Sequence, residues 1–305
     1  MRVLLITGGW STERDVALMG AKAVQTSLEQ LGHDVTVLDL KFSMNTLLSE
    51  ARAHDFAFIH LHGSPGEDGM VQAMLETVGC PYQGAGPAAS FLALNKTVSK
   101  CVFRENGILT ADWELVTEMP EADWTPDFSY PIFVKPNLGG SSLGMSMIHS
   151  AEELRPALQK VFDLGEEAII EPLIKGVEVT CPILGDEALP LILIKPADDA
   201  GFFDYENKYQ PGVAQEICPA PIDPELAKII QTATLKAHKA LGLTGYSRGD
   251  FILTPDGKAY LLEVNTLPGM TPNSLVPQSA AEAGMSFDDL IARLIELGME
   301  HAAQK

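Results

Sequence analysis

The first ninety or so residues alternate short apolar runs with segments whose apolar positions recur at helical spacing. Ala17, Ala21, Val24, Leu28 and Leu31 are three or four residues apart, which places them on one face of a helix. Strands are expected on either side of it and beyond, at 3–7, 34–40 and 56–63, with a further helix at 70–78. Alternation of strand and helix implies a parallel sheet covered by helices.

The pattern changes after residue 90, where most apolar runs follow one another without a long helix between them. Strands are expected at 130–136, 145–148, 166–174, 177–184 and 189–195, the last three forming one antiparallel sheet, and a helix at 151–162. Asp223 followed by Pro224 predicts the start of a helix with an inward stripe of Leu226, Ile229, Ile230, Ala233, Ala237 and Leu241. Ser286 is expected to open the last helix. The aromatic stretch 198–212 is weakly periodic, as functional loops often are.

Composition and charge narrow the classes of protein that fit. The 305 residues suggest at least two domains, and 41 acidic against 21 basic residues give a net charge of −20. An acidic chain of this kind is not expected to bind nucleic acid, whose phosphates need a basic face. The apolar runs are too short to cross a membrane, and the N-terminus does not resemble a signal peptide. Four widely spaced cysteines predict reduced core thiols in a cytoplasmic protein.

A hairpin at 246–265 is the first candidate for chemistry. Its Pro-Asp-Gly turn places Asp250 opposite Glu263 to within about one residue, so that their Cβ atoms would be about 5 Å apart. Asn265 shares a face with Glu263, and Arg248 shares one with Asp250. An all-oxygen set of carboxylates and an amide suits Mg²⁺ rather than Zn²⁺. The alternative is a cluster of arginine and carboxylates that holds no metal.

A Gly/Ser-rich loop at 137–144 is the second candidate, and Lys135 ends the strand before it. A cation beside unobstructed backbone N–H groups suits a nucleotide phosphate, although the chain contains no Walker A sequence. Residues 140–144 also match G-x-S-x-G, the nucleophile elbow of serine hydrolases. That elbow needs a helix after the turn, whereas a strand pattern follows here. A hairpin loop without chemistry is the third alternative.

Two weaker signals lie in the N-terminal part. Residues 8–11 join the first strand to a helix, but G-x-G-x-x-G is absent, so a dinucleotide site is not supported. Glu13 and Arg14 would face any ligand at this turn. His60 and His62 share one face of a strand near its end. Core packing is the usual role of such a pair. Because His62 stands at a strand end before a polar loop, a binding role is favoured as much as core packing for this residue.

Ten short motifs follow one another from residue 8 to residue 287: GGWSTERDV (8–16), LHGSPGEDG (61–69), PYQGAG (81–86), LNK (94–96), VKPNLGGSSLGM (134–145), EVT (178–180), FDYENKY (203–209), GYSRGDF (245–251), LLEVNTLPGMTPNSLVP (261–277) and AGMSF (283–287). Through these motifs the chain resembles the D-alanine–D-alanine ligases of the ATP-grasp superfamily. The resemblance implies an α/β fold in which a Rossmann-like (pre-ATP-grasp) parallel sheet precedes an ATP-grasp fold. The implied domains are 1–94, 95–180 and 181–305, the last with a mobile loop at 198–214.

The resemblance also implies roles for individual residues. The ATP-binding set is Lys96 and Lys135 for the phosphates, Ser141 and Ser142 in a closing loop, and Glu171 and Glu178 for adenine and ribose. The metal ligands are Asp250, Glu263 and Asn265. The substrate-binding set is Glu13 and His62 for the first D-alanine and Lys208, Ser274 and Leu275 for the second. The catalytic set is Glu13, Ser141, Tyr209, Arg248 and Gly269, with Arg248 and the Gly269 backbone at an oxyanion and Tyr209 on a mobile loop that closes towards Ser141 and Glu13.

The implied reaction joins two D-alanine molecules through a D-alanyl phosphate, with ATP and two Mg²⁺ ions, for which Mn²⁺ can substitute, and it supplies peptidoglycan precursors. The implied assembly is a homodimer in the cytoplasm that binds neither nucleic acid nor membrane. The nearest alternative is a ligase that joins D-alanine to D-lactate or D-serine, although Tyr209 argues against the lactate version. A nucleotide-binding protein without catalysis and a serine hydrolase are the remaining alternatives.

Overall fold

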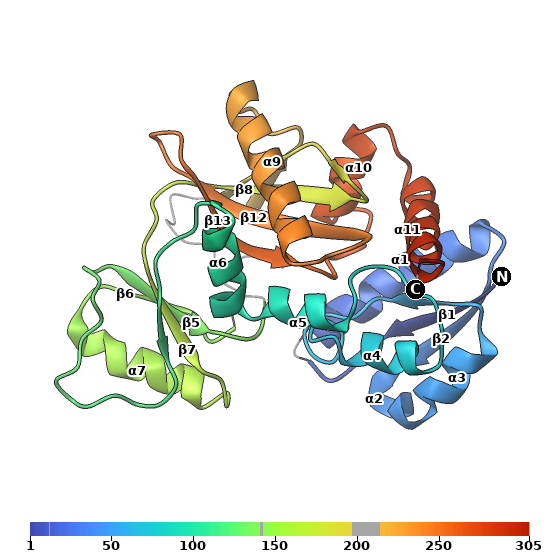
Figure 1. The fold of residues 1–305 in the computed structure, drawn as a ribbon, viewed down its shortest axis with the longest axis horizontal. Coiled ribbons are helices and arrows are strands. Elements are labelled where there is room, and N and C mark those ends of the chain that lie inside the picture. Colours follow the sequence, from blue (N-terminus) through green and yellow to red (C-terminus); the bar gives the residue numbers. More distant parts are fainter. Residues whose placement is uncertain (12, 141–142, 197–213, 305) are drawn as a thin grey trace.

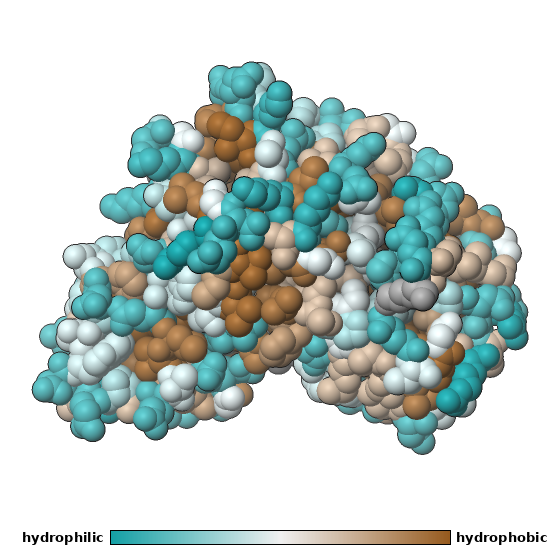
Figure 2. Space-filling model, in the orientation of Figure 1, coloured by the Kyte–Doolittle hydropathy of each residue, from teal (hydrophilic) through white to brown (hydrophobic). Residues whose placement is uncertain are grey.

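The structure is a computed structural model that describes residues 1–11, 13–140, 143–196 and 214–304. Its strands form three sheets, one in each lobe of the molecule (Figure 1). In Figure 1 the N-terminal lobe lies at the right, a small sheet with helix α7 lies at the lower left, and the large sheet lies above helix α5. Figure 2 shows that this face is hollowed at its lower edge, between the two lower lobes.

The N-terminal lobe contains the predicted parallel sheet, in the order β2-β1-β3. Its strands are β1 (Arg2–Thr7), β2 (Asp34–Asp39) and β3 (Phe56–Ile59). The helices around it are α1 (Arg14–Gln30), α2 (Leu40–Ser43), α3 (Leu47–Ala53) and α4 (Met70–Thr77), with a 3₁₀ turn η1 (Met44–Thr46). The chain returns to this lobe at its end, through α10 (Leu275–Glu282) and α11 (Phe287–Ala302). Buried leucines and isoleucines of α11, with Val276 and Ala280 of α10, join the core of β1 and β3.

The small sheet is antiparallel, in the order β4-β7-β5-β6. Its elements are β4 (Glu114–Val116), β5 (Ile132–Pro136), β6 (Ser146–Ile148), β7 (Ala168–Pro172) and helix α7 (Ala151–Phe162). Residues 166–174 were expected to join the sheet of the two following strands, and that expectation was wrong, because β7 pairs with β4 and β5 instead. The Gly/Ser loop joins the antiparallel pair β5 and β6, which is not the strand–turn–helix that a nucleophile elbow requires.

The large sheet runs β11-β10-β8-β12-β13, with β9 paired to β8, and all of these pairings are antiparallel. Its elements are β8 (Val177–Leu184), β9 (Glu187–Ala188), β10 (Ile192–Pro196), β11 (Ala214–Ile217), β12 (Tyr246–Leu253), β13 (Ala259–Asn265), and the helices α5 (Pro87–Leu94), α6 (Lys96–Glu105) and α9 (Pro224–Ala240). The expected domain boundary between residues 180 and 181 lies inside β8. The division into domains stays a prediction.

Local sequence signals explain several of these ends. The Asp223 side chain accepts from the backbone of Glu225 and Leu226, with Pro224 as the first helical residue of α9, and Ser286 forms a capping box with Asp289. Two expectations of burial were wrong. Ile229 is 56% exposed, while Thr234 takes an inward place on α9, and Cys101 is exposed although Cys80 and Cys181 are buried.

Candidate functional site

The hairpin of β12 and β13 has the register that its turn predicted. Asp250 pairs with Glu263 and Arg248 pairs with Asn265. Gly257 adopts a positive φ of 80° in the connecting turn, a conformation that glycine adopts without strain. A bulge follows Asp250, since Phe251 pairs with Leu261. Partners across a ladder share a face, so these four polar side chains project from the same side of the large sheet.

Asp250 is the centre of a dense hydrogen-bond cluster. Arg248 donates to both of its carboxylate oxygens through Nε and Nη2, each at 2.8 Å. Asn265 Nδ2 donates at 2.9 Å, and Thr180 Oγ1 of β8 donates at 2.6 Å. Burial alone would lower the pKa of Arg248, but the adjacent Asp250 carboxylate outweighs it and the pKa is raised. The guanidinium is therefore a permanent charge held in one orientation, as an oxyanion donor must be.

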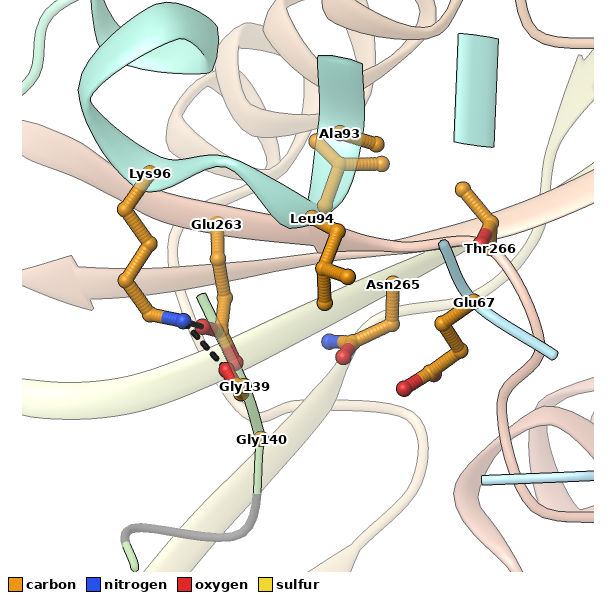
Figure 3. Close-up of a pocket in the computed structure, with 10 residues that line it drawn as sticks. Glu67, Ala93, Leu94, Lys96, Gly139, Gly140, Glu263, Asn265 and Thr266 are labelled. Atoms are coloured by element: carbon orange, nitrogen blue, oxygen red, sulfur yellow. Dashed lines mark hydrogen bonds and ion pairs between the residues drawn. The ribbon is translucent and has the colours of Figure 1, made fainter. Parts of the chain in front are cut away.

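A pocket adjoins this cluster where α6 begins (Figure 3). Lys96, the first residue of α6, donates from Nζ to the Gly139 carbonyl at 2.6 Å and lies 3.5 Å from Glu263 Oε2. Glu67 and Asn265 also line the pocket. Lys96 thus lies between the Gly-rich loop and the hairpin, which are the two segments that sequence reasoning associated with phosphate and with metal.

Lys135 and Glu171 lie on neighbouring strands of the small sheet. Lys135 Nζ is 2.6 Å from Glu171 Oε2, and Lys100 Nζ of α6 is 2.7 Å from Glu171 Oε1. Burial raises the pKa of Glu171, but Lys135 and Lys100 outweigh it, so the pKa is lowered and the group is a carboxylate. Glu178 lies elsewhere, on β8 in register with Ile252 of the large sheet.

Glu13 and His62 lie together where the N-terminal lobe meets the Gly-rich loop. A Cβ atom at Gly63 or at Gly140 would lie 3.7 or 3.6 Å from Glu13 Oε2. Burial lowers the pKa of His62. The nearby Glu13 raises it in part, and Arg248 lowers it further. His62 is therefore a neutral imidazole near neutral pH, close to both an acidic group and the guanidinium.

Gly269 and Ser274 lie side by side before helix α10. A Cβ atom at Gly269 would be 3.0 Å from Ser274 Oγ, which accepts from the Thr271 backbone at the same distance. Leu275 is the first residue of α10, so its backbone N–H points out of the helix N-terminus. Such a terminus favours a carboxylate.

Ser141, Ser142, Lys208 and Tyr209 lie outside the described residues, as does most of the expected loop 198–214. Sequence reasoning missed Glu67, Lys100 and Thr180. Burial and the neighbouring Glu13 raise the pKa of Glu67 to about 8. A signal for Lys100 was present, because Lys96, Lys100 and Phe103 follow the i, i+4, i+7 spacing of one helix face.

The donor atoms fit a hard cation. Glu263 and Asp250 both carry carboxylates, but each oxygen of Asp250 already accepts two hydrogen bonds, so a cation would have to displace one of these donors. Asn265 uses its amide nitrogen for Asp250, so its amide oxygen is the atom that can face a cation. Among the described residues, no group of three or more His, Cys, Asp or Glu side chains could hold a metal. The hairpin set has two acidic residues and one amide, which favours Mg²⁺ over Zn²⁺ on the chemistry of its donors.

Two sequence models of known families match the chain: one described as D-ala D-ala ligase C-terminus matches residues 102–296, and one described as D-ala D-ala ligase N-terminus matches residues 41–85. A D-alanine--D-alanine ligase of Nitratidesulfovibrio vulgaris is 62% identical over 304 residues, covering 100% of both chains. The helices in the described part of the chain include none that is long and apolar enough to span a membrane.

Solved structures of the same family have the same fold. A D-alanine--D-alanine ligase from Bacillus anthracis complexed with ATP has a TM-score of 0.87 at 35% identity and covers 100% of this chain and 99% of its own. VanG D-Ala:D-Ser ligase from Enterococcus faecalis has a TM-score of 0.82 at 30% identity, covering 97% and 98%. Two family models and a full-length relative at 62% identity show that the chain belongs to the D-alanine–D-alanine ligase family, with an ATP-grasp fold.

Proposed function

We propose that the chain joins two D-alanine molecules into D-alanyl-D-alanine while ATP is converted to ADP and phosphate. The observation that carries this proposal is the convergence of three lobes on one site. The hairpin contributes Arg248, the Gly-rich loop meets Lys96, and the N-terminal lobe contributes Glu13 and His62. A buried guanidinium beside acidic groups and phosphate-binding lysines suits acyl transfer driven by a nucleotide.

The nucleotide side of the site is built from lysines and carboxylates. Lys96 and Lys135 bind the phosphates, Ser141 and Ser142 cover them, and Glu171 and Glu178 face the base and the ribose. Asp250, Glu263 and Asn265 would hold Mg²⁺, and we propose two ions, which Mn²⁺ can replace. When bound, such ions neutralise the negative charge of the phosphates.

The amino-acid side follows from charge. Glu13 binds the ammonium of the first D-alanine and His62 lies beside its carboxylate. Ser274, the Leu275 backbone N–H and Lys208 bind the carboxylate of the second D-alanine. Arg248 and the Gly269 backbone N–H stabilise the oxyanion that forms when the amine attacks.

The order of events follows from the chemistry of carboxylates, which are poor electrophiles. The first D-alanine carboxylate attacks the γ-phosphorus of ATP, and ADP leaves. The amine of the second D-alanine then attacks the carbonyl of the acyl phosphate, and inorganic phosphate leaves. Water would hydrolyse that intermediate, so we propose that Tyr209 and Ser141 close the site before it forms.

The test is phosphate release from ATP with D-alanine alone and with L-alanine, D-serine or D-lactate added to D-alanine in turn, with products identified by mass spectrometry. D-Alanine alone is expected to give stoichiometric phosphate and D-alanyl-D-alanine. A mixed D-alanyl-D-serine or D-alanyl-D-lactate as the main product would establish the alternative specificity. We further propose that the enzyme is a cytoplasmic homodimer that supplies peptidoglycan precursors.

A further inference from the structure

Lys100 is a buried cation that belongs neither to the proposed metal site nor to the lysines proposed to bind phosphate. Its side chain has no exposed surface, and lysine is almost never fully buried unless it is paired. The ammonium contacts Glu171 at 2.7 Å and donates to Thr110 Oγ1 at 2.7 Å. It also lies 5.6 Å from the centre of the Trp113 ring. Burying a charged ammonium costs free energy, so favourable interactions must offset that cost.

The charges in this cluster do not balance within it. Lys100 and Lys135 share the single carboxylate of Glu171, with contacts of 2.7 and 2.6 Å to its two oxygens. One carboxylate neutralises one ammonium, so the cluster carries one surplus positive charge. Lys100 is enclosed, whereas the Lys135 side chain is 12% exposed. The surplus charge is therefore presented to a ligand by Lys135, and a ligand that meets it is anionic.

The cluster also connects the two sheets. Lys135 and Glu171 lie in the small sheet, on β5 and β7. Thr110, which accepts from Lys100, donates to the carbonyl of Leu261 at 2.7 Å. Leu261 belongs to β13 of the large sheet, two residues before Glu263. Lys100 thus ties the small sheet to the strand that carries the hairpin carboxylate.

We propose that Lys100 is a positioning residue for the nucleotide. It neutralises Glu171, so that the Lys135 ammonium can leave that carboxylate and bind a phosphate instead. Through its hydrogen bond to Thr110, Lys100 also holds the cluster next to β13. The inference rests on the proposed ATP chemistry. Without Lys100, Lys135 would be the only one of these two lysines left to pair with Glu171. The phosphate would then have to compete with a buried carboxylate for Lys135.

The test measures affinities for ADP and for adenosine by calorimetry, in the presence of Mg²⁺, because their ratio isolates the contribution of the phosphates. Lys100→Met keeps the length and apolar stem of the side chain but removes its charge. We expect at least a tenfold loss of ADP affinity with less than a threefold change for adenosine. Arg104→Met is the matched control, since Arg104 lies on the same helix and over the same Trp113 ring without contacting Glu171. It is expected to leave both affinities within twofold.

A second substitution separates this account from a purely structural role. In Lys100→Met/Glu171→Gln the carboxylate that retains Lys135 is gone, so the ratio of ADP to adenosine affinity is expected to recover towards the wild-type value. A purely structural Lys100 predicts that the double variant is worse than the single one. Equal ADP affinity of wild type and Lys100→Met, or a further fall of the ratio in the double variant, would overturn the proposal.

Thr110→Val keeps the experiment decisive if Lys100→Met does not fold. It preserves side-chain shape and the lysine, and removes the hydroxyl link to Leu261. We expect about a threefold loss of ADP affinity, with adenosine affinity and the melting temperature little changed, and an unchanged ADP affinity would contradict the proposal. A wild-type protein that binds no ADP at all would instead reject the proposed function.

Discussion

Two buried carboxylates on different sheets are held by cations in different ways. Asp250 of the large sheet and Glu171 of the small sheet are each 4% exposed. One Arg248 fork binds both oxygens of Asp250, while two separate lysines take one oxygen each of Glu171. A planar guanidinium fixes orientation, whereas an ammonium is a point charge on a flexible stem that can change partners. The first arrangement suits a preorganised donor to an oxyanion, and the second suits a cation that moves to a phosphate.

The largest effect is expected at the hairpin carboxylate opposite Asp250. Glu263→Gln keeps the size of the side chain and removes one negative charge from the proposed Mg²⁺ site. We expect kcat to fall by at least about 1000-fold, equivalent to about 4 kcal/mol in the barrier. Steady-state kinetics at saturating Mg²⁺ measures this. Glu187→Gln on the exposed strand β9 is the control, and near-normal turnover of Glu263→Gln would show that the hairpin is structural.

The fork itself is tested by Arg248→Lys, which retains the charge and loses the planar pair of donors. We expect kcat to fall by about 100-fold, or about 3 kcal/mol, with the KM for ATP changed less than about threefold. Arg293→Lys, at a surface ion pair with Glu296, is the matched control. If the KM for ATP rises steeply while kcat is preserved, Arg248 binds nucleotide and the contrast with the lysines of Glu171 fails.

A smaller effect, on stability rather than on turnover, is expected at His238, which packs on the face of β12 opposite Arg248. His238 of α9 contacts Ser247 Oγ at 2.7 Å, and burial lowers its pKa to about 4. Because the folded state binds a proton less readily than the unfolded state, this group costs stability as the pH falls from about 6.5 towards 4. Between pH 7 and pH 5 the loss is about 2 kcal/mol.

His238→Gln is expected to remove that share of the pH dependence, whatever its effect on stability at pH 7. Urea denaturation at pH 7 and pH 5 measures the difference, and comparison of each protein with itself cancels the cost of the substitution. His60, whose pKa burial lowers to about 3, is retained in both proteins and contributes equally. An identical change in unfolding free energy for variant and wild type would mean that His238 is protonated in the folded state.

Local signals predicted the parts of the site that one turn or one cap determines. The Pro-Asp-Gly turn fixes the pairing of Asp250 with Glu263 because its length leaves little freedom of register. The bulge after Asp250 was not predictable, since it depends on packing of both neighbouring strands. The sheet to which β7 belongs was also missed, because apolar alternation shows that a strand forms and does not show its partner.

Long-range contacts account for the remaining gaps. Glu67 is brought near Glu13 by the turn at Gly63, whose N–H donates to the Glu67 carboxylate at 2.8 Å. Lys100 lies with Phe103 on the buried face of α6, but its partner Glu171 is 71 residues away along the chain. From sequence alone a lysine is expected to be solvated, and its burial can be predicted only once the fold shows the carboxylate with which it pairs.

The fate of one oxygen atom tests the central claim most directly. D-Alanine labelled with ¹⁸O in its carboxylate is incubated with ATP, Mg²⁺ and the enzyme, and the phosphate and dipeptide are analysed by mass spectrometry. Attack of that carboxylate on the γ-phosphorus, followed by attack of the second amine, transfers one ¹⁸O to each phosphate released with D-alanyl-D-alanine. Unlabelled phosphate would contradict the account, because it would mean that ATP is cleaved without an acyl phosphate of D-alanine.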